Sequence, residues 1–100
     1  MVTITKTVAK RMMGEVPEDK RFWCYDGRVF KSLQELEAAF NEMTEETFRY
    51  HSNETKNDFS NWVRDVIGDE KMALDLQKST SAAKAAKIVA TRVAWLKSRK

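Results

Sequence analysis

Capping residues recur along this chain, each placed directly before a stretch whose apolar residues follow the helical period. Ser32 and Glu35 form an S-x-x-E capping box, and the apolar side chains after them fall on one helical face. Four more openings of this kind follow, at Thr44, at Asn57 or Asp58, at Asp69 and in the run 79–81. Because capping and periodicity agree so often, we expect a mainly α fold, a compact bundle of five or six short helices.

One segment departs from the helical pattern, because its apolar residues are aromatic and β-branched. Residues 22–30 contain two such runs separated by Asp26-Gly27. This arrangement is typical of a β-hairpin with a two-residue turn, whose central residues both have positive φ. That turn predicts the pairs Trp23–Phe30 and Cys24–Val29. We therefore expect one N-terminal β-hairpin at about residues 22–30, with one aromatic face packed on helices and the other a candidate stacking surface.

The length of 100 residues favours one domain. We expect a single domain over residues 1–100, with a core at about 15–96 and a basic C-terminal helix at about 81–99. Ile4, Val8 and Met12 have helical spacing and predict a further helix over residues 3–13 that ends at Gly14. The β-branched content of this segment leaves a short strand as the alternative.

The composition of the chain indicates the cellular compartment that we expect for it. The single cysteine forms no internal disulfide, and cysteine-rich zinc sites are excluded. No apolar run approaches the ~18–20 residues that span a bilayer. The first six residues also lack the apolar core of a secretion signal. We therefore expect a cytoplasmic protein without membrane contact.

Motifs for catalysis, metals or cofactors are scarce. The three glycines lie far apart, so no phosphate-binding loop is present. Cys24 and His51 are formally a nucleophile and a base, but no oxyanion turn or third orienting residue accompanies them. The loop cluster around His51 lacks the ligand density of a zinc site. We expect no catalytic residue, no metal site and no small-molecule cofactor, and an enzyme is the least favoured class.

The net charge of +3 conceals a strong segregation along the chain. Residues 1–31 carry +3, residues 32–52 carry −4, residues 53–78 carry −2 and residues 79–100 carry +6. Such asymmetry is typical of a chain that contacts a polyanion, or whose acidic and basic parts contact each other. The alternative is a solvated surface with cations favoured near a helix C-terminus.

The expected last helix separates apolar from basic residues. Its core stripe comprises Ala82, Ala85, Ala86, Val89, Val93 and Leu96. The opposite side carries Lys84, Lys87, Ile88, Thr91, Trp95 and Arg99, with Arg92 at the flank. Basic residues interleaved with tryptophan can follow a phosphate backbone and stack on a base. We predict polyanion contacts from Lys84, Lys87, Arg92, Lys97 and Arg99, with Trp95 stacking. The alternative is that Ile88 and Trp95 belong to the core.

A polar cluster lies just after the middle of the chain, between residues 51 and 64. It consists of His51, Asn57, Asp58, Asn61 and Arg64. We expect a structural network that holds one loop, with Arg64 pairing either with Asp58 or with a glutamate of residues 35–46. A recognition site for a peptide or nucleotide is the alternative.

Two blocks of this sequence resemble a small domain family of unknown function from archaea and bacteria, whose members occur alone or attached to other proteins. The first block is the run 22–29 with Ser32 to Leu36, and the second is the run 48–51 with Lys56 to Asp69. The resemblance covers roughly residues 15–96 and implies one compact domain. It implies no activity, cofactor or catalytic residue.

These observations favour a non-enzymatic binding or scaffold module that contacts a polyanion, such as nucleic acid, through its basic C-terminal helix. The competing class is a protein–protein interaction or self-assembly module, in which the acidic helices of one copy meet the basic helix of another.

Overall fold

The chain folds into six α-helices and one hairpin across residues 4–99, which are the residues that the computed structural model describes; the side chain of Arg99 lies outside the described part. The helices are α1 (Lys6–Met12), α2 (Leu33–Glu42), α3 (Glu45–His51), α4 (Asp58–Trp62), α5 (Glu70–Gln77) and α6 (Ala82–Arg99). The strands are β1 (Phe22–Trp23) and β2 (Val29–Phe30), and single turns form η1 (Glu18–Lys20) and η2 (Val63–Ile67). The predicted fold class is confirmed.

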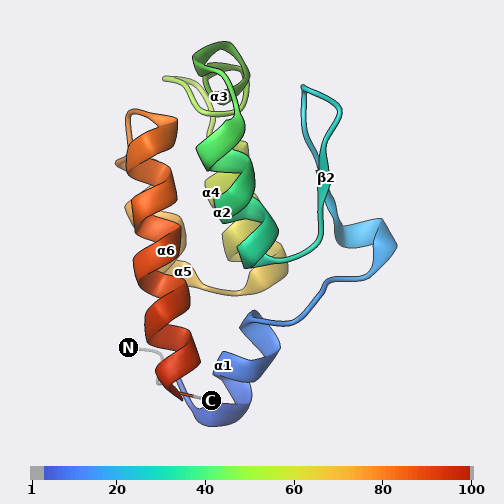
Figure 1. Cartoon of the computed structure of the whole chain (residues 1–100), viewed down its shortest axis with the longest axis vertical. Helices are drawn as coiled ribbons and strands as arrows, with labels where there is room; N and C mark the ends of the chain where they lie inside the picture. The colour runs from blue at the N-terminus through green and yellow to red at the C-terminus, as the bar shows by residue number, and fades with distance from the viewer. Residues whose placement is uncertain (1–3, 100) are drawn as a thin grey trace.

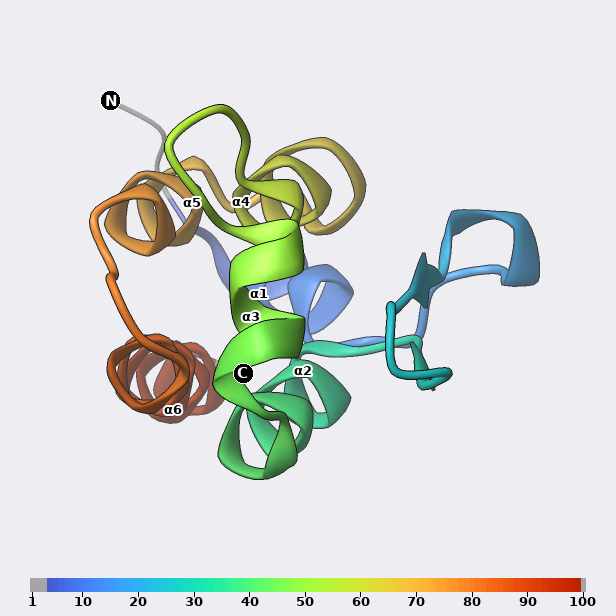
Figure 2. The same cartoon turned by 90° about the horizontal axis from the view of Figure 1, so that it is seen from above.

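The longest helix, α6, lies antiparallel to α2 along the long axis of the molecule (Figure 1). Helix α1 packs at the end where α6 finishes, and α3 lies at the opposite end. Helices α4 and α5 form the other side of the bundle, and the hairpin projects on the side away from α6 (Figure 2). Leu36, Phe59, Val89 and Leu96 are among the fully buried side chains, so the core lies between these helices.

The predicted caps are present at the starts of the helices. The Ser32 hydroxyl accepts from the Glu35 N–H, and the Thr44 hydroxyl accepts from the Thr47 N–H. The side chains of Asn57, Asp69 and Ser81 cap α4, α5 and α6 in the same way. Each cap satisfies an amide that would otherwise lack a partner, so the sequence encodes the helix starts locally.

The N-terminal helix is also confirmed where the structure describes it. It begins after Thr5, whose hydroxyl accepts from the Val8 N–H, and it ends one residue before the C-cap Met13. Residue 3, at the start of the predicted range, lies outside the described residues. Among the described helices, none is long and apolar enough to cross a membrane.

The fourth predicted helix changes character halfway. Its apolar residues keep the helical period as far as Ile67, but after Trp62 the backbone widens into the π-helical turn η2. Both Gly68 and Asp69 donate their N–H groups to the Val63 carbonyl, at 2.8 and 3.2 Å. Gly68 has φ of +87°, which allows the chain to reverse into α5 without a steric penalty.

The register of the hairpin differs from the prediction by one residue. Phe22 pairs with Phe30 and Trp23 pairs with Val29. The loop has three residues rather than two, because the Gly27 N–H donates to the Cys24 carbonyl and Gly27 alone has positive φ. This is the three-residue hairpin loop with a glycine bulge. The prediction was wrong because Asp26 does not adopt positive φ.

The corrected register determines which aromatic rings enter the core. Phe22 and Phe30 are buried and stack at 4.8 Å between ring centroids, and Phe22 also contacts Phe59 at 5.2 Å. The next residue of each strand toward the turn, Trp23 in β1 and Val29 in β2, faces solvent. The hairpin is therefore anchored through one face, as its short length requires.

Candidate nucleic-acid interface

The two sides of α6 differ as its sequence predicted. All six residues of the apolar stripe are buried, whereas Lys84, Lys87 and Thr91 are exposed on the opposite side. Ile88 and Trp95 are half-buried and pack partly against the core. Trp95 therefore packs partly on the core while part of its side chain stays exposed, and its stacking on a base stays a prediction.

A groove of about 1310 Å³ runs beside this face, between α5 and α6. Its α6 wall includes Lys87, Ile88, Thr91 and Trp95, and its α5 wall includes Glu70, Lys71, Leu74 and Asp75. Ile4 and Gly68 also line it. Leu74 is 56% exposed, which is high for a leucine and leaves an apolar surface in the groove.

Arg92 holds the bottom of the groove together. Its Nε and Nη2 donate to the two carboxylate oxygens of Asp69 at 2.6 and 3.0 Å, and Asp69 is 1% exposed. The same carboxylate caps α5 by accepting from the Met72 N–H. The guanidinium of Arg92 lies 4.4 Å from the centre of the Trp95 ring. Two of its donors are thus used inside the protein, and Arg92 positions Trp95 rather than presenting a free cation.

Most cations in the chain between α1 and α6 pair with carboxylates, whereas most of the described cations of α1 and α6 do not. Within the described residues, Arg92 is the only cation of these two helices with a carboxylate at ion-pair distance. The exposed cations without such a partner are Lys6, Lys10, Arg11, Lys84, Lys87 and Lys97. By contrast, carboxylates pair with Arg28, Lys31, Arg49, Lys56, Arg64 and Lys71. The side chain of Arg99, the remaining predicted contact, lies outside the described residues.

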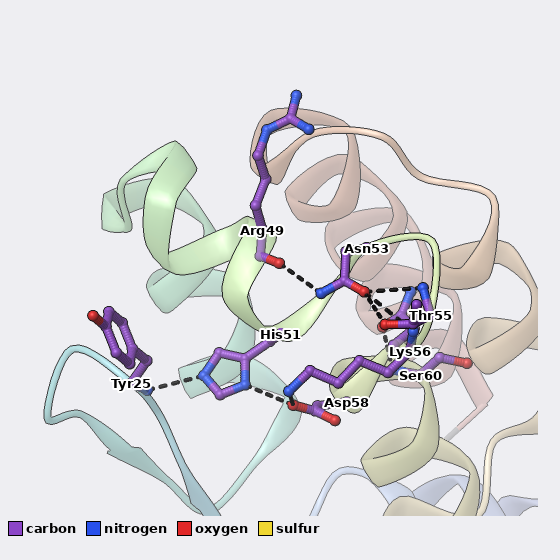
Figure 3. A network of polar contacts seen from close by, with 9 residues as sticks. Tyr25, Arg49, His51, Asn53, Thr55, Lys56, Asp58 and Ser60 are labelled. Carbon is purple, nitrogen blue, oxygen red and sulfur yellow. Dashed lines mark hydrogen bonds and ion pairs between the residues drawn. The ribbon is translucent and has the colours of Figure 1, made fainter.

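The predicted polar network separates into parts. His51 is buried, and its Nε2 accepts from the Tyr25 N–H at 2.9 Å (Figure 3). Nδ1 lies 2.9 Å from Asp58, which also pairs with Lys56 at 3.0 Å. Because Nε2 accepts, the neutral ring carries its proton on Nδ1 and donates it to Asp58.

These contacts shift the pKa of Asp58. Partial burial raises the pKa of the carboxyl, but the hydrogen bonds from His51 and Lys56, together with the charge of Lys56, outweigh it. The net effect holds the pKa of Asp58 below its ordinary value. The loop between α3 and α4 is therefore closed by a carboxylate that is stable in its ionised form.

Asn57, Asn61 and Arg64 do not join His51 and Asp58. The Asn57 amide donates to the Leu76 carbonyl and ties α4 to the end of α5. Asn61 is exposed, and Arg64 pairs with its neighbour Asp65 at 2.9 Å. The predicted pairing of Arg64 with Asp58 or an α2–α3 glutamate is wrong, because the guanidinium pairs with the adjacent Asp65 instead.

A second exposed aromatic group surrounds the hairpin tip. Tyr25 and Tyr50 stack at 4.2 Å between centroids, and Trp23 beside them is 69% exposed. Sequence reasoning anticipated the exposed hairpin rings but missed Tyr50, which the fold of α3 brings to them. The hairpin, which carries Trp23 and Tyr25, lies on the side of the molecule away from α6 (Figure 2).

Among the described contacts, Cys24 and His51 do not pair as a nucleophile and a base. It is buried in the hairpin, and burial raises the pKa of its thiol. Both ring nitrogens of His51 are engaged, with Tyr25 and with Asp58. Among the described residues no group of three His, Cys, Asp or Glu side chains is placed to hold a metal ion.

Comparisons with protein-family models, curated proteins and solved structures found no match.

The groove is the feature that sequence reasoning missed. A partial signal existed, because Leu74 lies about 150° from the buried face of α5 on a helical wheel. The pairing of Asp69 with Arg92, by contrast, joins residues 23 positions apart and has no local signal.

Proposed function

We propose that this chain is a non-enzymatic nucleic-acid-binding module whose contact surface consists of α1 and the exposed side of α6. The observation that carries the proposal is the distribution of ion pairs. Six exposed cations of these helices have no carboxylate partner among the described residues, and neither helix contains an acidic residue. Cations without a carboxylate partner are available to replace the counterions of phosphates.

The placement of the acidic segments supports the same surface. Glu42 and Glu45 lie toward the α3 end of the molecule, where Arg28 and Arg49 pair with them. Lys6, Lys10 and Arg11 belong to α1 at the other end, next to the last turns of α6 (Figure 1). A polyanion on α1 and the last turns of α6 therefore avoids the carboxylates of α2 and α3, whereas Lys84 and Lys87 belong to the first turns of α6, at the α3 end.

Two further expectations belong to the proposal. We assign the chain to the prokaryotic domain family that its two sequence blocks resemble. We also place it in the cytoplasm, where its single thiol stays reduced.

Charge reversal tests the surface. The variant Lys84→Glu/Lys87→Glu is compared with Lys20→Glu/Arg49→Glu, which changes the net charge equally at exposed positions outside α1 and α6. Fluorescence anisotropy with a labelled oligonucleotide at low salt should show at least tenfold weaker binding for the first variant and a smaller change for the second. Equal losses in both, or no binding by the unmodified protein to DNA or RNA, would overturn the proposal.

Self-assembly is the second candidate. Glu37 and Glu46 have no ion-pair partner among the described residues, so acidic α2 and α3 of one copy have charge left to meet α1 and α6 of another. Light scattering coupled to size exclusion at low and high salt separates the two functions. A concentration-dependent oligomer that dissociates in high salt favours self-assembly, whereas a monomer at both salts excludes it.

A further inference from the structure

The groove between α5 and α6 has two chemically different walls. The α6 wall presents Lys87, which has no carboxylate partner among the described residues. The α5 wall presents Glu70, together with Asp75, which pairs with Lys71 at 2.8 Å. Arg64, which pairs with Asp65, lines the groove on the α5 side as well, so that side carries charges of both signs and attracts a phosphate less than Lys87 does.

We infer that this groove receives unstacked bases, so that the ligand of the α1–α6 surface is single-stranded nucleic acid. The inference rests on the proposed function and names its ligand class. The backbone follows the lysines on the α6 side, and the bases turn inward between the two walls. A duplex has no free bases to insert and meets only the cations.

The interior of the groove suits bases rather than phosphates. Leu74, Ile88 and Trp95 supply apolar and aromatic surface, which attracts the faces of bases and does not favour ions. Carboxylates such as Glu70 accept hydrogen bonds from the exocyclic amino groups of bases. The α5 side thus attracts the backbone less than the lysines of α6 do, and its carboxylates are compatible with base edges.

Trp95 is held in place before any ligand arrives. The Arg92 guanidinium lies against its ring, and Arg92 is itself fixed by the buried carboxylate of Asp69. A fixed ring loses little conformational freedom when a base stacks on it. The volume of about 1310 Å³ exceeds the roughly 300–1,000 Å³ of ordinary small-molecule pockets, so the groove has room for more than one base.

Simple charge attraction predicts the opposite preference. A duplex has the higher charge density, and its binding responds more steeply to neutralised phosphates than that of a single strand. A preference for the single strand at equal length and salt therefore has to come from contacts with bases. Comparing single strands with a duplex therefore tests the inference independently of the proposed function.

The experiment measures anisotropy of a labelled 12-nucleotide DNA strand, the same sequence as RNA, and the corresponding DNA duplex, all at one low salt concentration. The expected result is that one or both single strands bind at least fivefold tighter than the duplex. Trp95→Leu should weaken single-strand binding about tenfold and leave duplex binding nearly unchanged. The matched control Trp23→Leu, on the exposed hairpin ring, should change neither.

Trp95 also packs partly on the core, so a second variant protects the test from misfolding. Leu74→Ala alters a side chain that is 56% exposed and should weaken only single-strand binding, by a few-fold. Duplex binding equal to or tighter than single-strand binding overturns the inference and leaves the proposed function intact. Loss of single-strand binding in Trp23→Leu but not in Trp95→Leu also overturns it. Absence of all nucleic-acid binding overturns both the inference and the proposed function.

Discussion

His51 joins three elements through one imidazole ring. It accepts from the hairpin backbone at Tyr25, donates to Asp58 at the start of α4, and extends from the last position of α3. Its ring also packs on Phe22 and Phe59, at 5.0 and 5.2 Å between centroids. A single residue thus links the position of the hairpin to the closure of the α3–α4 loop.

His51→Phe should keep the ring packing and lose both hydrogen bonds. The Tyr25 N–H is then left without its partner, and we expect a loss of about 1–3 kcal/mol in the free energy of unfolding. Urea denaturation measures this loss. Trp23→Ala serves as the control, because the exposed side chain should change stability by less than about 0.5 kcal/mol. Equal stability of His51→Phe and the unmodified protein would contradict the role of the two hydrogen bonds.

Because Asp58 titrates, the contribution of the His51–Asp58 contact to stability depends on pH. Because its pKa in the folded protein is held below the ordinary value, ionised Asp58 stabilises the fold above about pH 4, and the effect is lost as the pH falls through the folded pKa. Asp58→Asn should therefore be less stable than the unmodified protein at pH 7. The difference should shrink at pH 3, and denaturation at the two pH values measures it. A difference that grows on acidification would show that the sign is wrong.

At the scale of elements, the turn between η2 and α5 requires a left-handed backbone conformation that favours glycine. Gly68 has φ of +87°, and no heavy atom lies within 4 Å of where its Cβ would be. The cost of a side chain there is therefore conformational rather than steric crowding. The Asp69–Arg92 pair follows immediately, so this turn also determines where the floor of the groove lies.

Gly68→Ala should lower the free energy of unfolding by about 1–2 kcal/mol, the cost of placing an L-residue in the left-handed region. Gly14→Ala is the matched control, because Gly14 does not have positive φ and its Cβ would lie 3.4 Å from the nearest atom, the Arg11 carbonyl oxygen. Thermal melting of the two variants compares them. A melting temperature for Gly68→Ala at or above that of Gly14→Ala would contradict the explanation.

The elements also show how far sequence reasoning reaches. Helix starts were predictable because Ser32, Thr44 and Asn57 bond to amides within three residues, which is a local signal. The hairpin was predictable, but not its register, because a two-residue and a three-residue loop both use Asp-Gly and only the packing of Phe22 on Phe59 separates them.

The candidate site was only partly predictable for the same reason. The basic side of α6 follows from the helical period, but the groove needs α5 as a second wall. Arg92 was expected to contact phosphate, and only the tertiary fold brings buried Asp69 to its guanidinium. Contacts between residues distant in sequence thus decide which cations remain available.

At the scale of the whole molecule, exposed cations without a carboxylate partner among the described residues lie on α1 and along α6, which runs from the α3 end to the α1 end. Most cations in the chain between these two helices are paired with carboxylates. The small net charge of +3 therefore understates the attraction that one surface exerts on a polyanion.

The dependence of binding on salt tests this claim most directly. If the six unpaired cations each displace a counterion from a single strand, the logarithm of the association constant should fall with the logarithm of salt concentration with a slope of about −4. Anisotropy titrations of one labelled oligonucleotide across a series of KCl concentrations give the slope. A value near −4 that becomes about 1.4 units shallower in Lys84→Ala/Lys87→Ala supports the account. A slope near zero, or one that these two substitutions leave unchanged, would contradict it.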